Sequence, residues 1–376
     1  MAPLKESLAR LRPVDAAAAA AADERQAQLT KPPGALGALE TLGSRLAAIA
    51  GVCPPPVPKR PIVTVFAGDH GVLAEGVSPW PAEVTAQMVA NFLGGGAAIN
   101  VIAREVGAAI VAVDVGVATP IPEVPPDARG GATVPGRLVS AKVRHGTANF
   151  VNGPAMSLAE AHQAIQVGLT LADRLVDQGT DLLVTGDMGI GNTTPSAALV
   201  AAITGWPARA VTGRGTGISD NTLDRKIEVV EAGLERVAAA HSVAVTALGS
   251  LPGDVLLSEV GGLEIGAIAG VAIGGAMRRV PVVVDGVISL AGALVAVSMA
   301  PVVTDYLVAG HRSVEPGATA AMEHLGLEPL LDLRLRLGEG TGACLAIPLV
   351  RAAARILNEM ATFGDAGVSG STDAGD

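Results

Sequence analysis

Short runs of β-branched residues, each followed by a glycine-rich turn and a helical stretch, recur along this sequence and limit the folds open to it. Such runs predict buried strands over residues 62–66, 108–115, 182–185 and 281–286. A further strand is expected over residues 301–307. Because strands that alternate with helices pack as parallel sheets covered on both faces, the sequence predicts an α/β fold around a buried parallel sheet.

Helical stretches separate these strands. Thr194 and Pro195 have the residue types that favour the N-cap and the first position of a helix, so we expect a helix to begin there. The proline-rich residues 53–58 are typical of a stiff linker that ends a small N-terminal helical segment. Residues 116–138, rich in Pro and Gly, are expected to form a long excursion. The other helical stretches expected are 15–29, 39–50, 83–102 with a break at 94–96, 157–177, 221–240, 259–277 and 343–361.

The bulk composition narrows the possible functions and locations. The net charge of −10 argues against a nucleic-acid platform, which needs basic stripes. Cys53 and Cys344 lie far apart and match no metal-ligand spacing, so a reduced cytoplasmic compartment is the simplest inference. The N-terminus lacks the basic-then-apolar order of a signal peptide.

One uncharged stretch, residues 286–304, has the length of a membrane span. It contains Gly286, Gly292 and Pro301, and no basic residue anchors either end. A buried helix followed by a buried strand explains this pattern better, so we expect no association with a membrane.

Polar residues follow the predicted strands at the sheet edge where α/β proteins bind ligands. Asp69 and His70 come after the first strand and could orient a substrate or only fix a turn, and both interpretations stay open. Residues 186–195 form a glycine-rich loop between a strand and a helix, which is a natural seat for phosphate, and residues 213–217 form a second such loop. Lys226 is close enough in sequence to reach an anion there, or is an exposed surface lysine.

Glu339 stands among glycines in the run Leu-Gly-Glu-Gly-Thr-Gly, just before the last predicted helix. A lone carboxylate among apolar neighbours tends to have a raised pKa, which suits a general base near neutral pH. The alternative is that Glu339 only favours the positive end of the following helix. The sequence by itself leaves both hypotheses open.

The sequence lacks the motifs of several other classes of enzyme. No carboxylates stand at metal-ligand spacing, and no Gly-x-Ser-x-Gly elbow of an α/β-hydrolase occurs. The Asp-Asp pair of diphosphate-dependent phosphoribosyltransferases is missing from the strand end at Asp285. Glycine-rich anion loops with isolated carboxylates predict group transfer on a phosphorylated small molecule, with no metal and no cofactor.

Several motifs occur in the order found in nicotinate-nucleotide:dimethylbenzimidazole phosphoribosyltransferases, and the chain resembles that family from about residue 30 to residue 361. The motifs are residues 68–72, 84–88, 186–194, 311–317 and 336–342. The resemblance implies a Rossmann-like six-stranded parallel sheet with helices on both faces. It also implies a homodimer in which the neighbouring subunit helps to close each active site.

The resemblance further implies how the chain is divided. A small helical domain is expected from both chain ends, with residues 1–55 as its N-terminal segment. Residues 343–376 would add its C-terminal helix and a flexible tail, and residues 60–340 would form the large α/β catalytic domain.

The implied reaction joins nicotinate mononucleotide and 5,6-dimethylbenzimidazole to give α-ribazole 5′-phosphate and nicotinate, for the lower ligand of cobalamin. Glu339 would be the general base, and Asp187, where family members often carry Glu, a second catalytic residue whose role its shorter side chain puts in question. The substrate-binding residues implied or expected are Asp69, Trp80, Gln87, Met88, Gly189, Gly191, Asn192, Thr193, Lys226, Ser313, Arg336 and Gly338.

Alternatives remain within and outside this chemistry. The same transfer to another base or to a phenol fits the sequence equally, because apolar pockets discriminate poorly between similar rings. A non-catalytic nucleotide-binding protein on this fold is the alternative from another class, and release of nicotinate on adding the acceptor separates the two.

Overall fold

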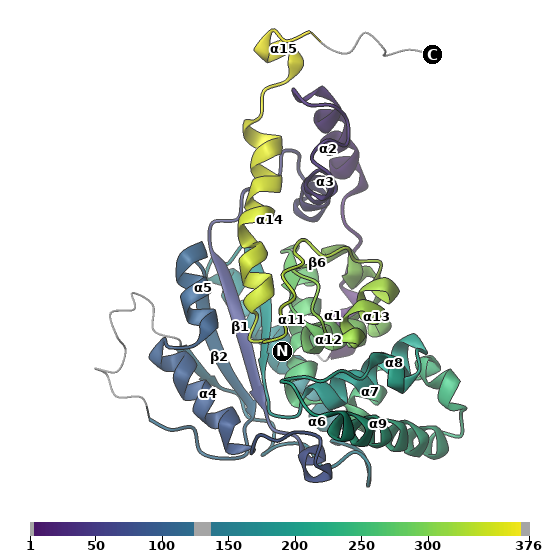
Figure 1. The fold of residues 1–376 in the computed structure, drawn as a ribbon. Coiled ribbons are helices and arrows are strands. Elements are labelled where there is room, and N and C mark those ends of the chain that lie inside the picture. Colours follow the sequence, from purple (N-terminus) through teal and green to yellow (C-terminus); the bar gives the residue numbers. More distant parts are fainter. Residues whose placement is uncertain (1–3, 124–136, 370–376) are drawn as a thin grey trace.

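A parallel sheet lies at the centre of the computed structural model, which describes residues 4–123 and 137–369 (Figure 1). Its order is β3-β2-β1-β4-β5-β6, and every neighbouring pair is parallel. This confirms the predicted six-stranded α/β fold. The order reverses between β1 and β4, which is where such sheets open a crevice at their carboxyl ends. The strands are β1 (Pro61–Gly68), β2 (Ala109–Gly116), β3 (Arg137–Ser140), β4 (Leu182–Met188), β5 (Val282–Val284) and β6 (Leu307–Ala309).

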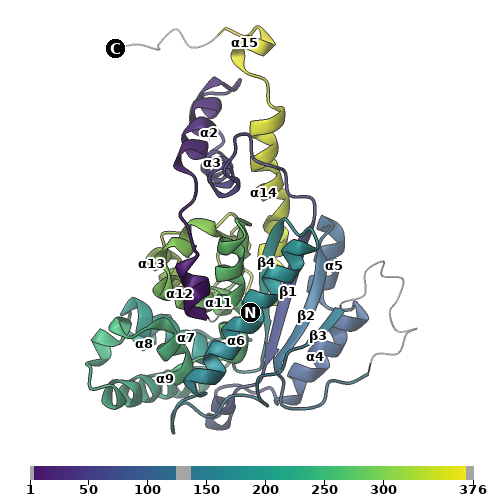
Figure 2. The same cartoon turned by 180° about the vertical axis from the view of Figure 1, so that it is seen from behind.

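Helices cover both faces of the sheet, as Figures 1 and 2 show from opposite sides. On one face α4 (Glu83–Gly94), α5 (Ala98–Val106) and α14 (Thr341–Glu359) pack against the strands. On the other face lie α6 (Leu158–Asp177), α11 (Leu263–Met277) and α12 (Val287–Met299). The remaining helices around this body are α7 (Thr193–Thr204), α8 (Ala208–Val211), α9 (Asp220–Ala240), α10 (Gly253–Val260) and α13 (Pro316–Leu325), with the 3-10 turns η1 (Gly71–Glu75) and η3 (Val245–Ser250).

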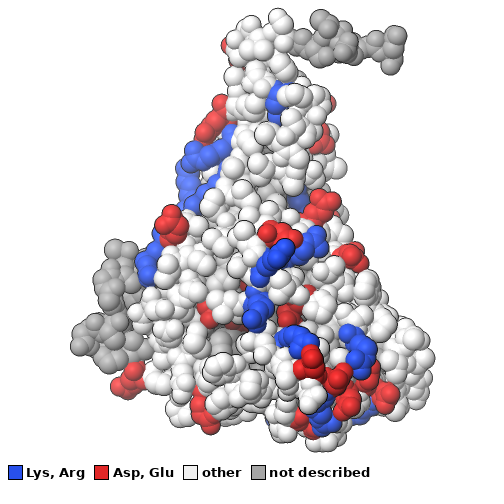
Figure 3. All heavy atoms as spheres, in the orientation of Figure 1, with Lys and Arg blue, Asp and Glu red and all other residues white. Residues whose placement is uncertain are grey.

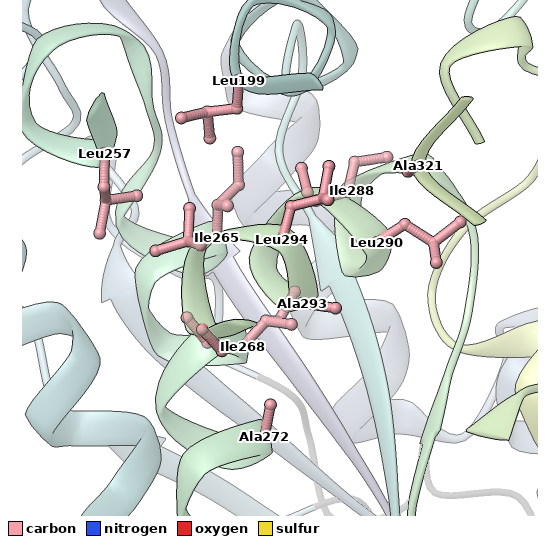
Figure 4. Packing of buried hydrophobic residues seen from close by; sticks show 14 of the residues in the cluster. Leu199, Leu257, Ile265, Ile268, Ala272, Ile288, Leu290, Ala293, Leu294 and Ala321 are labelled. Atoms are coloured by element: carbon pink, nitrogen blue, oxygen red, sulfur yellow. The ribbon is translucent and has the colours of Figure 1, made fainter. Parts of the chain in front are cut away.

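The core is aliphatic, as expected from a chain with four Phe, two Trp and one Tyr. Leu, Ile, Val and Ala side chains of α7, α10, α11, α12 and α13 meet in the region shown in Figure 4. Such small side chains let helix axes approach closely. A Cβ on Gly168 of α6 would lie 1.8 Å from the Ala267 carbonyl oxygen, and one on Gly270 of α11 would lie 1.9 Å from the Ile165 carbonyl oxygen.

Two predicted elements differ in the structure because of glycine and proline. Residues 301–307, predicted as a strand, are mostly the 3-10 helix η4 (Pro301–Tyr306), and the strand β6 follows it. Pro301 occupies the first turn of η4, where its missing N–H is harmless. The predicted helix over 259–277 is interrupted at Gly261 and Gly262, whose extended backbones separate α10 from α11.

The other differences are smaller. Helix α7 begins at Thr193 with Asn192 as its N-cap, so the predicted N-cap at Thr194 is wrong. Strand β3 was not predicted, because it is short and follows the Pro- and Gly-rich segment. Of that segment, residues 124–136 lie outside the described residues. In the uncharged stretch 286–304, the buried helix α12 is confirmed, and η4 follows it in place of a strand.

A small helical bundle projects from the sheet-containing body (Figure 1). It consists of α2 (Ala16–Gln28), α3 (Ala38–Ala50) and the outer part of α14, with α15 (Phe363–Ala366) beyond it. Ala22, Ala47 and Leu357 form its own small core. The first helix, α1 (Leu4–Ala9), lies instead against the large body, where Leu4 and Leu8 pack on the main core.

By length and composition alone, Glu83–Val106 would pass for a membrane span. The structure divides this stretch into α4 and α5, with Gly95 in a left-handed conformation between them. Helix α5 then packs on β2 and on α14. The two helices are therefore part of the covering of the sheet.

Candidate functional site

A cavity of about 710 Å³, counted with its open mouth, lies at the carboxyl ends of β4, β5 and β6. Most of the residues predicted to form the site line it. They are Trp80, Asp187, Gly189, Gly191, Asn192, Thr193, Lys226, Ser313, Arg336 and Gly338. Glu339, Gln87, Met88 and Asp69 are not among the lining residues. The two predicted glycine-rich loops and the turn before α14 thus meet at one place.

The loop from β4 to α7 forms one wall of this cavity. Gly189 must be glycine, because a Cβ there would lie 2.3 Å from the Gly68 carbonyl oxygen at the end of β1. Asn192, the N-cap of α7, donates from Nδ2 to Asp187 Oδ2 at 2.9 Å. The Ile190 N–H donates to Thr85 Oγ1 of α4 at 3.1 Å. The Thr194 N–H donates to the Gly191 carbonyl at 3.0 Å and Pro195 has no N–H, so the N-terminus of α7 faces the cavity chiefly with its partial positive charge.

Residues 213–217 form the opposite wall, and three side chains hold their backbone. Lys226 Nζ donates to the Gly213 carbonyl at 2.9 Å and to Thr193 Oγ1 at 2.7 Å. Arg336 Nη1 donates to the Gly215 carbonyl at 3.0 Å. Glu315 Oε1 accepts the Gly215 N–H at 2.8 Å. The second loop is therefore fixed from α9, from the turn before α13 and from the segment before α14.

Lys226 is the cation buried most deeply in the site, with 1% of its surface exposed. Burial lowers the pKa of its ammonium group to about 8, although the nearby charge of Glu315 acts in the opposite direction. The alternative of an exposed surface lysine does not hold. A buried ammonium that already bonds two loop oxygens is well placed to bind an anion.

Asp187 ends β4 and faces the cavity next to Gly338, whose missing Cβ would lie 3.1 Å from Asp187 Oδ2. Burial raises the pKa of Asp187 well above its usual value, and the negative charge of Asp285 raises it further. Its Oδ1 has no hydrogen-bond partner among the described residues. Burial and Asp285 therefore favour the protonated form of the Asp187 carboxyl more than is usual for an aspartate, and in that form it has a hydrogen-bond donor to offer.

Glu339 is buried immediately behind the cavity wall at Gly338, with 5% of its surface exposed. Its φ of +63° lies between Gly338 at +82° and Gly340 at +84°. Burial raises the pKa of Glu339 to about 7, the Ile99 N–H at the start of α5 lowers it, and the charge of Asp285 raises it. Oε2 of Glu339 has no hydrogen-bond partner in residues 4–123 and 137–369. A carboxyl in this state can exchange a proton near neutral pH.

Two buried ion pairs were not predicted, one behind the cavity and one at its wall, where His311 is a lining residue. His70 Nε2 lies 3.0 Å from Glu264 Oε1, and His311 Nε2 lies 3.2 Å from Asp285 Oδ1. Burial alone would lower the pKa of each histidine, but the partner carboxylate raises it above its usual value. The signals that could have located them are Glu264, the single charge in a long apolar stretch, and the polar residues that end β1, β5 and β6.

The remaining predicted residues have different environments. Trp80 is half exposed at the mouth, where its Nε1 donates to Thr216 Oγ1 at 3.2 Å. On α4, Gln87 is exposed and Met88 is half-buried against the hydrophobic core. Asp69 is buried, and its Oδ2 accepts the Ala118 N–H at 2.7 Å. This contact matches the turn-fixing interpretation of Asp69, which does not reach the cavity wall.

The surface charge is mixed on the face that Figure 3 shows. Acidic and basic side chains alternate over the corner formed by α8 and α9, where Arg209 pairs with Asp224 and Arg225 with Glu228. Within the described residues, no group of His, Cys, Asp and Glu side chains is arranged to hold a metal ion.

Comparison with known proteins gives a consistent result. A family profile described as "Phosphoribosyltransferase" matches residues 11–368. Nicotinate-nucleotide–dimethylbenzimidazole phosphoribosyltransferase of Salinispora tropica is 52% identical over 371 residues, which cover 97% of this chain and 99% of that protein. The protein of the same name from Chloroflexus aggregans is 53% identical over 373 residues and covers 99% of both chains.

The fold also has solved counterparts. The crystal structure of the nicotinate-nucleotide–dimethylbenzimidazole phosphoribosyltransferase of Thermus thermophilus superimposes with a TM-score of 0.85. It is 48% identical in sequence, and the match covers 95% of this chain and 100% of that chain. A structure described as CobT from the same organism gives a TM-score of 0.84, also at 48% identity.

Proposed function

This chain belongs to the nicotinate-nucleotide–dimethylbenzimidazole phosphoribosyltransferase family, and we propose that the cavity at the carboxyl edge of its sheet is the active site. The enzyme moves the ribose phosphate of nicotinate mononucleotide to 5,6-dimethylbenzimidazole and releases nicotinate. The product, α-ribazole 5′-phosphate, supplies the lower ligand of cobalamin. What remains to be assigned is the part that each residue plays.

The bond that breaks joins C1′ of the ribose to a pyridinium nitrogen. That nitrogen already carries a positive charge, so nicotinate leaves with a neutral ring nitrogen. One nitrogen of the incoming benzimidazole attacks C1′ from the opposite face, which inverts the configuration from β to α. As this bond forms, positive charge develops on the acceptor ring, and the proton on its other nitrogen becomes acidic.

Glu339 is the general base that takes this proton. The observation that carries the assignment is a buried carboxyl with a pKa of about 7 and a free Oε2, directly beside the cavity-lining residue Gly338. General-base catalysis of this kind contributes about 10²–10⁴-fold to the rate. Alignment of the two substrates in the cavity contributes further.

Asp187 assists as a neutral acid. In the protonated form, which burial and Asp285 favour, it can donate a hydrogen bond from the cavity wall, whereas an ionised carboxylate there would repel the substrate phosphate. Its shorter side chain, compared with the Glu common in the family, keeps the carboxyl close to Asn192. The role proposed for Asp187 is therefore hydrogen-bond donation.

The nucleotide lies between the two glycine-rich loops. The loop that carries Gly189, Gly191, Asn192 and Thr193 leads into the N-terminus of α7, whose partial positive charge suits an anionic phosphate. The cations Lys226 and Arg336 and the hydroxyl of Ser313 line the same cavity, beside Gly338. Charge-assisted hydrogen bonds from these groups would fix the phosphate and leave C1′ near Gly338.

The acceptor ring enters on the side of α4 and the mouth. Trp80 offers a half-exposed indole there, and Gln87 and Met88 lie on the neighbouring helix. Because pockets for flat rings discriminate poorly between similar rings, competition between dimethylbenzimidazole, adenine and phenols tests which acceptor is preferred.

We also propose that the enzyme is a cytoplasmic homodimer with a small domain formed by α2, α3 and the outer part of α14. The separate core at Ala22, Ala47 and Leu357 supports the small domain. Trp80 and Leu337 are exposed apolar side chains at the cavity mouth, which supports the proposal that a second subunit covers them. Sedimentation measures whether the enzyme is a dimer.

The direct test of the mechanism is Glu339→Gln. This variant keeps the shape of the side chain but cannot accept the proton, so kcat should fall by about 10²–10⁴-fold while both substrates still bind. Nicotinate release measures kcat, and calorimetry measures binding. Glu359→Gln, an exposed glutamate at the far end of α14, is the matched control and should keep full activity. A near-normal kcat for Glu339→Gln would remove Glu339 from the mechanism.

A further inference from the structure

We infer that Asp285 is a positioning residue for Glu339: from the end of β5 it caps helix α14 and fixes the turn that carries the general base. This inference rests on the proposed function, in which Glu339 is that base. Asp285 itself does not line the cavity and touches no substrate in this scheme. Its backbone contacts therefore act on the turn that carries Glu339, while its charge also raises the pKa of Asp187.

The contacts of Asp285 bracket the glutamate. Asp285 Oδ2 accepts the N–H of Gly340 at 3.2 Å, and Oδ1 accepts the N–H of Ala343 at 2.9 Å. Gly340 directly follows Glu339, and Ala343 belongs to the first turn of α14. A carboxylate from another strand thus takes the place that the side chain of an N-cap residue normally fills.

The turn needs this external support. The N-cap of α14 is Gly340, which has no side chain to satisfy the free N–H groups of the helix. Glu339 has a φ of +63°, a conformation that residues other than glycine rarely adopt. A second contact closes the same turn, because Thr341 Oγ1 donates to the Gly338 carbonyl at 2.8 Å. Without such contacts the backbone could relax and move the carboxyl away from the acceptor.

His311 holds Asp285 from the other side. Their side chains are 3% and 0% exposed, and His311 Nε2 lies 3.2 Å from Asp285 Oδ1. His311 also packs against the first turn of α14, since a Cβ on Gly342 would lie 2.0 Å from His311 Cδ2. A buried carboxylate is retained only when it is paired and hydrogen-bonded, and Asp285 meets both conditions here.

A purely structural cap would have the same contacts but different consequences. It would stabilise α14 without acting through Glu339, so its loss would reduce the rate by the same factor whether or not Glu339 is present. The effect of a positioning residue on the rate disappears once the base that it positions has been replaced. A double-mutant cycle between Asp285 and Glu339 separates these cases.

The experiment compares wild type, Asp285→Asn, Glu339→Gln and the double variant by kcat for nicotinate release, counted per nucleotide-binding site from calorimetry. Asparagine keeps one acceptor oxygen and replaces the other with an amino group that cannot accept an N–H. Asp285→Asn should lower kcat by about 10- to 100-fold, because a misplacement of about 1 Å can cost about 10²-fold. The Kd for nicotinate mononucleotide should stay within about twofold, and the double variant should be within about twofold of Glu339→Gln.

Additional variants keep the test decisive if Asp285→Asn folds poorly. Thr341→Val removes the other contact of the turn at nearly constant volume, and should also slow turnover in a way that vanishes in the Glu339→Gln background. Asp15→Ala removes the side-chain cap of α2, far from the site, and serves as the control with unchanged kcat.

The failures of the two claims are distinguishable. If Glu339→Gln turns over slowly but Asp285→Asn and Thr341→Val do not, the positioning role is overturned and the proposed base stands. The positioning role is also overturned if the fall in kcat of the double variant equals the product of the falls in the two single variants. If Glu339→Gln itself keeps its kcat, the proposed function of Glu339 fails and the role of Asp285 fails with it.

Discussion

At the scale of single residues, burial moves the pKa values of Glu339 and Lys226 in opposite directions, toward neutrality. The pKa of the Glu339 carboxyl rises to about 7, and the pKa of the Lys226 ammonium group falls to about 8. Both shifts arise because removal from water disfavours the charged form of either group. The proposed chemistry needs both charged forms, an ionised Glu339 to accept a proton and a protonated Lys226 to bind phosphate.

The activity of the enzyme should therefore depend on pH in a bell-shaped manner. As pH rises through about 7, Glu339 loses its proton and kcat/KM should increase. Above about pH 8, Lys226 loses its charge and kcat/KM should decrease as phosphate binding weakens. Steady-state kinetics from below pH 7 to above pH 8 measure this profile. The pKa values obtained from kcat/KM belong to the free enzyme. The rising limb should be absent from the residual activity of Glu339→Gln, and a limb that persists there would point to another base.

The candidate site was predictable where its residues are close in sequence. The loop at residues 186–195 and the turn at Gly338 could be found because glycines beside polar residues mark backbone that approaches a ligand. The polar ends of the strands and the lone charge of Glu264 were visible in the sequence, but the pairings His70–Glu264 and His311–Asp285 were not, because each joins residues that meet only in the fold. The burial of Lys226 could not be inferred from the spacing of the apolar residues in α9 either.

At the scale of elements, the contact between α6 and α11 shows why so many glycines occur in this chain. Gly168 and Gly270 face the backbone of the opposite helix so closely that no side chain fits. Helix propensity alone would favour alanine at both positions by about 1 kcal/mol. Close packing of α6 against α11 outweighs that preference.

Gly270→Ala should destabilise the protein for this reason. The new Cβ would lie 1.9 Å from a carbonyl oxygen, so the helices must separate, at a cost of about 1–3 kcal/mol or more, which exceeds the propensity gain of about 1 kcal/mol. The midpoint of urea unfolding measures the effect. Gly364→Ala in α15 is the control, because a Cβ there meets no close neighbour. A Gly270→Ala variant as stable as wild type would show that the helices can adjust.

The elements themselves followed from the sequence wherever the pattern was long. Strands β1, β2 and β4 and helices α6, α9 and α14 match their predictions to within a few residues. Misjudged elements are short or interrupted. Strand β3 has four residues and pairs with β2 alone among the described strands. The β-branched residues 302–304 after Pro301 are typical of a strand, but they belong to η4.

At the scale of the whole molecule, α14 connects Glu339, the proposed general base, to the small bundle. The helix begins beside Glu339, crosses one face of the sheet and ends next to α2. Leu42 and Leu46 of α3 belong to the same apolar cluster as Val63 of β1 and Ile347 of α14. The bundle and the sheet therefore share a continuous hydrophobic core.

We expect the whole chain to unfold in a single cooperative transition. Trp80 and Trp206 report the large body by fluorescence, while far-ultraviolet circular dichroism reports helices in both parts. The two signals should change at the same temperature, and Leu46→Ala should lower that temperature for both, at a cost of about 2–5 kcal/mol. Loss of helix signal before any change in fluorescence would show that the bundle melts separately.

The contact between Thr85 and Ile190 limits how the enzyme can be redesigned. Helix α4 carries the residues expected to meet the incoming ring, and its Thr85 hydroxyl also anchors the loop that we propose binds the other substrate. Exchanging Gln87 and Met88 offers a route to different vitamin analogues only while Thr85 is left untouched. We therefore expect substitutions on α4 to change the choice of acceptor without loss of nucleotide binding only where the bond between Thr85 and Ile190 is kept.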